Sequence, residues 1–175
     1  MTVPNVLVAG LGSAHGDDQA GWLAIDHLQQ MLLQAPATHR HVMARKFSTP
    51  LDLLAVFPEH QHVLIVDAVQ VPPVENLPGS LRIELPAPWT RQSLASCLAH
   101  HPRPRLDTHG IGIDQVLQLA QLQSPSSLPQ VTLFGIPACD FAAFAPPSAE
   151  TTERARIAAA QILTELEGFV PRSPS

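Results

Sequence analysis

The sequence has few charged residues and no long apolar run. Of its 175 residues, 14% are charged, Lys46 is the only lysine, and the formal net charge is −5. The arginines are scattered, so the chain lacks the basic patch that is typical of nucleic-acid binding. Its longest apolar runs are far below the ~20 residues that a membrane-spanning helix needs. We therefore expect no nucleic-acid partner and no membrane insertion.

Cysteine is also scarce. Cys97 and Cys139 are the only two cysteines, and they lack the CxxC spacing of metal and redox motifs. The N-terminal stretch MTVPNVLVAG has neither the positive start nor the small-residue cleavage site of a secretory signal. We therefore expect a cytoplasmic protein with two free thiols.

Strand-like apolar runs alternate with helical patterns along the chain. The patterns predict strands at 5–10, 41–47, 62–69, 79–85 and 130–136, and helices at 17–32, 49–57, 114–122 and 148–167. Asp17 is a predicted N-cap and Gly168 a predicted C-cap, whereas the proline-rich stretch 86–106 is predicted to be irregular with at most one helical turn. This order predicts one α/β domain over residues 1–168 with a mainly parallel sheet, followed by a flexible tail at 169–175.

Acidic residues and one histidine follow the predicted strands. Ligands of parallel sheets bind at the carboxyl ends of strands, where Asp18, Asp67 and His109 are expected. Two carboxylates and an imidazole suit a divalent ion such as nickel or zinc. Adjacent residues on a helix point about 100° apart, so Asp17 is expected to cap the helix while Asp18 is the ligand. Purely structural roles, as a cap, a turn residue and a core histidine, stay open.

Other kinds of site are less well supported. Gly10-x-Gly12 follows a strand, but the third glycine of a dinucleotide fingerprint is replaced by His15, and no Walker signature follows. The adjacent carboxylates also argue against a phosphate, so a nucleotide-binding domain is a minor alternative. His15 is either a further ligand or a loop residue, and we favour the second. A nucleophilic Cys139 is disfavoured because it would need a lowered pKa.

The same segments resemble the maturation endopeptidases of [NiFe] hydrogenases. The matching segments are GLGSAHGDDQAG, VLIVDAV, PGSLRIEL, DTHGIGIDQVLQLA and LFGIPA, which occur in the family's order over residues 5–167. The resemblance implies a three-layer α/β/α sandwich around a twisted sheet of about five strands. It also implies that the family's metal ligands fall on Asp18, Asp67 and His109.

The resemblance further implies a hydrolase, an aspartic-type-like endopeptidase. Its reaction is one cut that removes the C-terminal extension of a hydrogenase large-subunit precursor after nickel insertion. The nickel is supplied by the precursor and recognised through the three ligands, and whether any metal is bound at rest stays open. Gly10, Gly12 and Gly110 are expected to let the substrate backbone approach closely. A non-catalytic chaperone that binds nickel or the precursor is the alternative.

The sequence departs from the family pattern in its first loop. Ser13 stands where asparagine is usual, and Gln19 stands where glycine is common. The loop between Gly12 and Asp17 is also one residue shorter than usual. These differences raise the question of whether the loop still presents Asp18 correctly.

Overall fold

A five-stranded sheet forms the centre of the protein. The computed structural model describes residues 6–35, 38, 40–70, 79–98 and 111–169. The strand order is β2-β1-β3-β5-β4, in which the first four are parallel and β4 is an antiparallel edge strand. The strands are β1 (Val6–Leu11), β2 (Val42–Phe47), β3 (His62–Gln70), β4 (Leu81–Leu85) and β5 (Gln130–Ala138). The predicted mainly parallel α/β sheet is confirmed.

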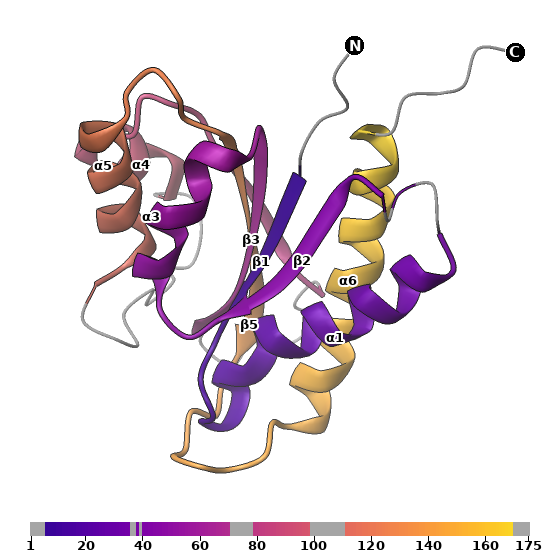
Figure 1. Cartoon of the computed structure of the whole chain (residues 1–175). Coiled ribbons are helices and arrows are strands. Elements are labelled where there is room, and N and C mark those ends of the chain that lie inside the picture. The colour runs from indigo at the N-terminus through magenta and orange to yellow at the C-terminus, as the bar shows by residue number, and fades with distance from the viewer. Residues whose placement is uncertain (1–5, 36–37, 39, 71–78, 99–110, 170–175) are drawn as a thin grey trace, which may run out of the picture.

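Helices cover both faces of the sheet and complete the three layers (Figure 1). One face carries α1 and α6, and the other carries α3, α4 and α5. The helices are α1 (Ala20–Leu33), α3 (Leu53–Val56), α4 (Arg91–Leu98), α5 (Ile113–Gln123) and α6 (Ala149–Phe169). Three 3-10 turns accompany them: η1 (Gly16–Gln19), η2 (Pro50–Asp52) and η3 (Phe57–Glu59). The predicted three-layer sandwich is therefore confirmed.

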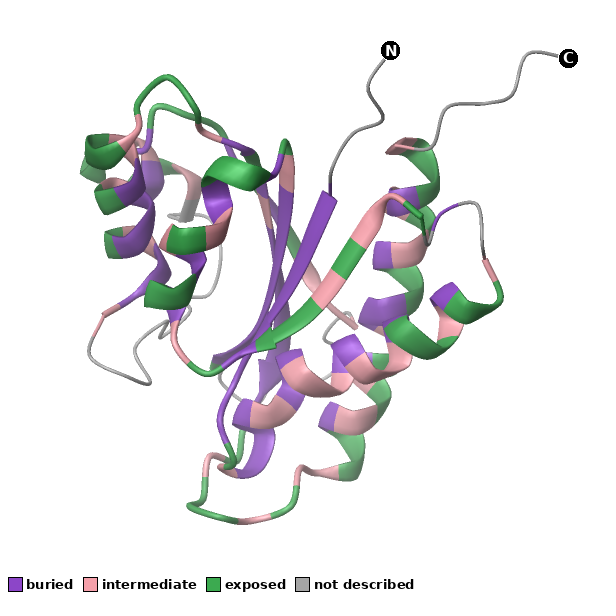
Figure 2. Cartoon of the chain, viewed as in Figure 1, coloured by how far each residue is buried: buried purple, intermediate pink, exposed green. Residues whose placement is uncertain are grey.

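The central strands are buried on both sides, which explains their mostly apolar sequences. Figure 2 shows the buried sheet between helices whose outer faces are exposed. Val6 and Val8 of β1 point into the core beneath α1 and α6, whereas Leu7 and Ala9 point into the core beneath α3 and α5. Successive side chains of a strand alternate in this way between the two faces of the sheet. The same alternation decides which layer each side chain near the strand ends faces.

Three local predictions are corrected by the structure. The stretch predicted to be irregular contains the helix α4, which begins where Thr90 and Ser93 cap each other. The Ser93 N–H donates to Thr90 Oγ1 at 3.1 Å, and the Thr90 N–H donates to Ser93 Oγ at 3.0 Å. The predicted helix at 49–57 is split into η2, α3 and the start of η3. Gly168 lies inside α6 rather than capping it.

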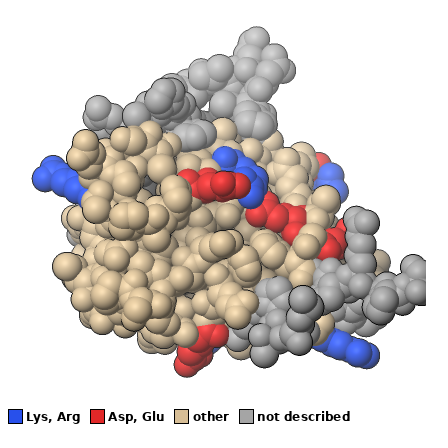
Figure 3. Space-filling view, turned by 90° about the horizontal axis from the view of Figure 1, so that it is seen from above, with Lys and Arg blue, Asp and Glu red and all other residues tan. Residues whose placement is uncertain are grey.

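Charges on the surface are few and mixed. Figure 3 views the protein from the end at which β1 begins, and positive and negative side chains lie side by side there. On β4, Arg82 pairs with Glu84 at 2.9 Å and with Glu165 of α6 at 2.7 Å. Among the described residues, no helix is long and apolar enough to cross a membrane.

Candidate functional site

The boundary between β1 and β3 is the topological switch point of the sheet. The two strands are neighbours, yet β2 separates them in sequence, and the helices after β1 and β2 lie on opposite faces. Ligands of parallel sheets bind at such a point. The pairing of β1 with β3 ends at Gly10 and Val66, while β3 continues to Gln70 beside β5. Asp67 is thus the first residue of β3 beyond its pairing with β1.

Asp18 reaches the switch point from the turn that follows β1. The chain leaves β1 and forms η1, which contacts β3. Asp18 is only 2% exposed, and its Oδ2 accepts a hydrogen bond from the Ser13 hydroxyl. Ser13 Oγ also lies 2.8 Å from His15 Nδ1. Ser13 therefore connects the His15 ring to the Asp18 carboxylate.

Asp67 faces the layer of α3 and α5 from inside β3. It follows Val63 and Ile65 in the same row of the strand, and these two belong to the core on that side. The side chain is 8% exposed, and its Oδ1 accepts a hydrogen bond from the Ala68 N–H at 2.9 Å. The strand predicted at 62–69 is confirmed and extends one residue further, to Gln70, where β5 still pairs with it at Ala138. Asp67 therefore lies within the strand rather than after it.

The two carboxyl groups are close enough to influence each other's charge. Burial raises the pKa of Asp67 to about 8, with a further contribution from the charge of Asp18, and the hydrogen bond from Ala68 opposes the shift only in part. Among the described residues, neither carboxylate forms an ion pair with a lysine, arginine or histidine. Buried carboxylates without a cationic partner are costly, and they are typical of sites that receive a cation. The electrostatics of this site therefore favour a positively charged ligand.

Asp17 has a different role from its neighbour, and the prediction that it caps its own helix is wrong. Neither η1 nor α1 has a side-chain cap. The Asp17 carboxylate instead crosses to the loop between β5 and α6. Its Oδ2 accepts from the N–H groups of Cys139 at 3.2 Å and Asp140 at 3.1 Å, and its Oδ1 accepts from Ser148 at 2.8 Å.

These three backbone donors decide the ionisation of Asp17. Burial alone raises the pKa of Asp17, but the hydrogen bonds from Ser148, Asp140 and Cys139 outweigh it and lower the pKa below its usual value. Backbone contacts join the same two loops, since the Asp17 N–H donates to Asp140 O at 2.6 Å and the Gly16 N–H donates to Ala145 O at 3.1 Å. Asp17 therefore clamps the β1–α1 loop to the β5–α6 loop, and we call this set of contacts the Asp17 clamp.

The glycines of the first loop serve helix packing rather than access by a substrate, which corrects the prediction for Gly10 and Gly12. A Cβ on Gly10 would collide with the Gly21 carbonyl and the Ile25 side chain of α1. A Cβ on Gly12 would lie 2.5 Å from the Asp18 carbonyl oxygen. Small residues are therefore needed where α1 lies directly against β1, and this packing fixes the position of η1.

Some of the predicted site lies outside the described residues. His109, the third predicted ligand, and Gly110 fall in the stretch 99–110, which is not described. Within the described parts of the chain, no group of three histidine, cysteine, aspartate or glutamate side chains could hold a metal ion. The structure thus brings Asp18 and Asp67 together, while the assignment of His109 stays a prediction. Cys139 lies next to the site as an exposed free thiol whose N–H is held by Asp17.

The structure places Ser13 and His15 in contact with the site, although the sequence predicts no ligand role for Ser13 and favours a loop role for His15. The signal that connects them is their spacing, because residues 13, 15 and 18 of one tight loop can meet around a single carboxylate. Spacing alone does not reveal which of the two aspartates they contact.

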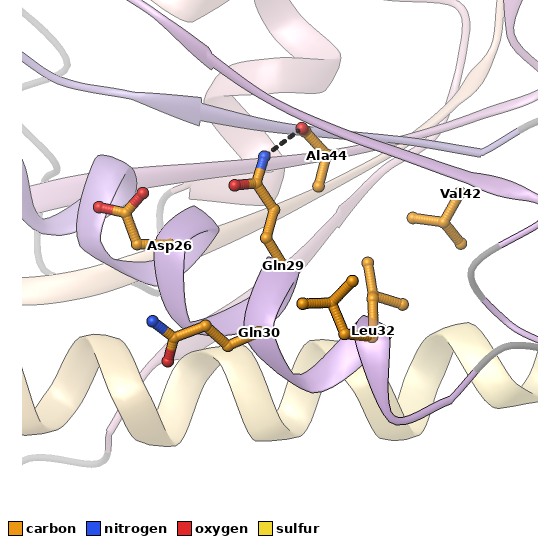
Figure 4. Close-up of a pocket in the computed structure, with 7 residues that line it drawn as sticks. Asp26, Gln29, Gln30, Leu32, Val42 and Ala44 are labelled. Carbon is orange, nitrogen blue, oxygen red and sulfur yellow. Dashed lines mark hydrogen bonds between the residues drawn. The ribbon is translucent and has the colours of Figure 1, made fainter.

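A separate hollow lies away from the switch point. It is an open groove between α1 and the edge strand β2, where Gln29 Nε2 donates to the Ala44 carbonyl at 3.0 Å (Figure 4). Its lining is Asp26, Gln29, Gln30, Leu32, Leu33, Val42 and Ala44. Since this lining contains only one carboxylate and no histidine or cysteine, the groove lacks the chemistry of the paired aspartates.

Comparisons with known proteins agree with the fold. No family model matches the sequence, and no curated protein matches it. Among solved structures, the [NiFe] hydrogenase maturation protease HycI from Thermococcus kodakarensis KOD1 is similar with a TM-score of 0.62 and 20% identity, over 94% of each chain. The hydrogenase maturating endopeptidase HybD from E. coli gives a TM-score of 0.65 at 17% identity, over 98% of this chain and 99% of that one.

A third similar structure is the hydrogenase 2 maturation peptidase from a Thaumarchaeota archaeon. It has 25% identity and a TM-score of 0.56, over 93% of this chain and 97% of that one. All three comparisons extend over nearly the full length of both chains. This chain therefore has the fold of the hydrogenase maturation proteases, and the resemblance seen in its sequence is confirmed in the fold.

Proposed function

We propose that this protein is a maturation endopeptidase of a [NiFe] hydrogenase. It removes the C-terminal extension of the large-subunit precursor after nickel has been inserted, and it recognises the nickel that the precursor carries. The observation that carries the proposal is the pair of buried carboxylates, Asp18 and Asp67, which meet at the switch point and have no cationic partner in the described part of the chain. The fold shared with hydrogenase maturation proteases supports the same activity.

The ligand chemistry follows from the charges. A divalent cation that approaches the two carboxylates relieves their mutual repulsion and favours the loss of the proton held by Asp67. In the proposed complex, Asp18, Asp67 and His109 complete the coordination of the precursor's nickel. The metal then brings the precursor's C-terminal segment to the site and polarises the scissile carbonyl or a bound water.

Ser13 orients Asp18 for this role. Its hydroxyl occupies Oδ2 of the carboxylate, which leaves Oδ1 to meet the cation. The bond between His15 and Ser13 in turn fixes the direction of the hydroxyl. Outer hydrogen bonds of this kind set the direction of a metal ligand. This arrangement supports a role for Ser13, the residue that replaces the usual asparagine, in presenting Asp18 to the cation.

The test is cleavage of a nickel-loaded large-subunit precursor, followed by mass spectrometry of its C-terminal extension. We expect the parent to cleave this precursor and to leave the nickel-free precursor intact. Asp18→Asn, Asp67→Asn and His109→Ala should each lower kcat/KM by more than about 100-fold, because each removes one ligand. Asp52→Asn changes an exposed carboxylate of η2 and is the matched control.

Two outcomes would contradict the proposal. Equal cleavage of nickel-free and nickel-loaded precursor would remove the metal from recognition. A stable complex with an intact precursor would favour the alternative, a non-catalytic protein that binds nickel or the precursor.

A further inference from the structure

A strained and exposed aromatic residue lies at the edge of the proposed site. Phe144, in the loop between β5 and α6, is 84% exposed, and its backbone φ is +56°. It is the only non-glycine residue with a positive φ among the described residues. A bulky side chain is rarely found in this left-handed region, where it is costly. Because its side chain is in solvent, burial does not compensate this cost.

The strain comes from the turn that Phe144 occupies. The Ala145 N–H donates to the Ala142 carbonyl at 3.2 Å, which closes a four-residue turn with Phe144 in its third position. Turns with a positive φ at the third position prefer glycine or asparagine there. A phenylalanine at this position therefore has no evident benefit for the turn itself.

The turn is nevertheless held firmly against the first loop. Ala145 O accepts from the Gly16 N–H at 3.1 Å and from Gln19 Nε2 at 3.2 Å. The Asp17 clamp holds the same loop at both ends, at Cys139 and at Ser148. The position of Phe144 is thus fixed by contacts that do not involve its own side chain.

Phe144 is connected to the carboxylate pair by continuous contacts. Its ring lies 5.1 Å from the His15 ring, between centroids, at an interplanar angle of 40°. His15 contacts Ser13, and Ser13 donates to Asp18. An exposed aromatic face therefore adjoins the place where the precursor's backbone must approach, and aromatic side chains are enriched among the residues that dominate binding energies.

We propose that Phe144 and His15 form a substrate-binding edge for the precursor. The occupant is the polypeptide segment that carries the scissile bond, and it contacts this edge through an apolar or aromatic side chain. This inference rests on the proposed function, because the continuity between the edge and the carboxylate pair identifies the partner. In the free protein the strained turn holds the Phe144 side chain in solvent, where a side chain of the precursor can contact it.

The test compares variants of Phe144 in steady-state cleavage of the nickel-loaded precursor and in binding to the immobilised precursor. Phe144→Ala and Phe144→Gly should raise KM and Kd about tenfold and leave kcat unchanged. Phe144→Tyr should keep the parent's KM and Kd because it retains the ring. Phe144→Gly should also raise the Tm, since glycine adopts a positive φ without strain.

Leu33→Ala is the matched control, because Leu33 is 76% exposed at the end of α1 far from η1. Unchanged KM and Kd in Phe144→Ala and Phe144→Gly would overturn the inference while the proposed function stands. A parent that binds but does not cleave would contradict the proposed function, and weaker binding by Phe144→Ala would still support the edge. A parent that neither binds nor cleaves would overturn both.

Discussion

Asp17 and Asp67 are both buried, but their carboxyl groups lie in contrasting surroundings. Asp17 accepts three backbone hydrogen bonds from a loop more than 120 residues away, and its pKa is lowered. Asp67, which shares its surroundings with Asp18, receives a single backbone hydrogen bond from the residues that the structure describes, and its pKa is raised to about 8. Three backbone donors therefore stabilise the charge of Asp17, whereas the pair of Asp18 and Asp67 has no cationic partner among the described residues.

This difference distinguishes a carboxylate that stabilises the fold from one that is suited to bind a cation. A carboxylate that is fully hydrogen-bonded by its own protein stabilises the fold in its ionised form. A buried carboxylate that lacks such partners destabilises the fold when it ionises, and it gains most from an external cation. Neutralising Asp17, by protonation or by substitution, should therefore lower the free energy of unfolding. Neutralising the ionised form of Asp67 should raise it.

The largest expected effect concerns Asp67 and pH. Because its folded pKa of about 8 exceeds the usual 3.8, the folded protein holds a proton that the unfolded chain has lost between these values. The free energy of unfolding should then fall as pH rises from about 4 to about 8, in total by on the order of 5 kcal/mol. In Asp67→Asn this fall should disappear. Chemical denaturation of the metal-free protein at several pH values measures the free energy of unfolding of the parent and of Asp67→Asn.

The control for this measurement is Asp52→Asn, which removes one negative charge at an exposed position. It should retain the parent's pH dependence. If the free energy of unfolding of Asp67→Asn falls with rising pH as much as that of the parent, groups other than Asp67 cause the fall. Asp17 contributes the opposite sign, because its lowered pKa gives stability that is present above pH 3.8 and is lost as pH falls further.

The next largest effect is expected from the Asp17 clamp. Asp17→Asn keeps the shape of the side chain but replaces one acceptor oxygen with a donor, which then faces backbone N–H groups. We expect the free energy of unfolding at pH 7 to fall by about 3 kcal/mol, because hydrogen bonds to a charged group are lost and buried donors stay unpaired. Thermal and urea denaturation measure this loss. A variant as stable as the parent would show that the clamp is dispensable.

The smallest effect is expected at Ser13, which belongs to the functional region. Ser13→Ala removes the hydrogen bond to Asp18 and should lower kcat/KM for the nickel-loaded precursor about tenfold, with little change in Tm. Ser13→Asn restores a donor and should recover most of the activity. If both variants lose the same activity, the hydroxyl does not act by orienting Asp18.

Most of the fold could be predicted from local patterns. The buried strands at Val6–Leu11 and His62–Gln70 are mostly apolar, and their alternation with helices indicates a parallel sheet. At most one helical turn was predicted in the stretch that contains α4, because the capping pair of this helix follows several prolines and its sequence has little apolar periodicity. Gly168 was misassigned because the presence of a glycine does not establish where a helix ends.

The site could be predicted in outline but not in its details. The positions of Asp18 and Asp67 at strand ends were enough to bring them together, because the carboxyl ends of parallel strands share one edge. The role of Asp17 could not be predicted, since its partners Cys139, Asp140 and Ser148 are distant in sequence. The predicted role of Gly10 also failed, because it depends on how closely α1 approaches the sheet.

The only lysine of the chain offers a way to see how a partner is oriented. Lys46 lies in β2 opposite Gly10 of β1, and its side chain is 40% exposed beside Asp26. Apart from the N-terminal amine, an amine-reactive cross-linker can therefore attach at a single place, close to the edge of the sheet where β1 ends. The residue of a bound precursor that is joined to Lys46 would give the direction in which its chain crosses the protein.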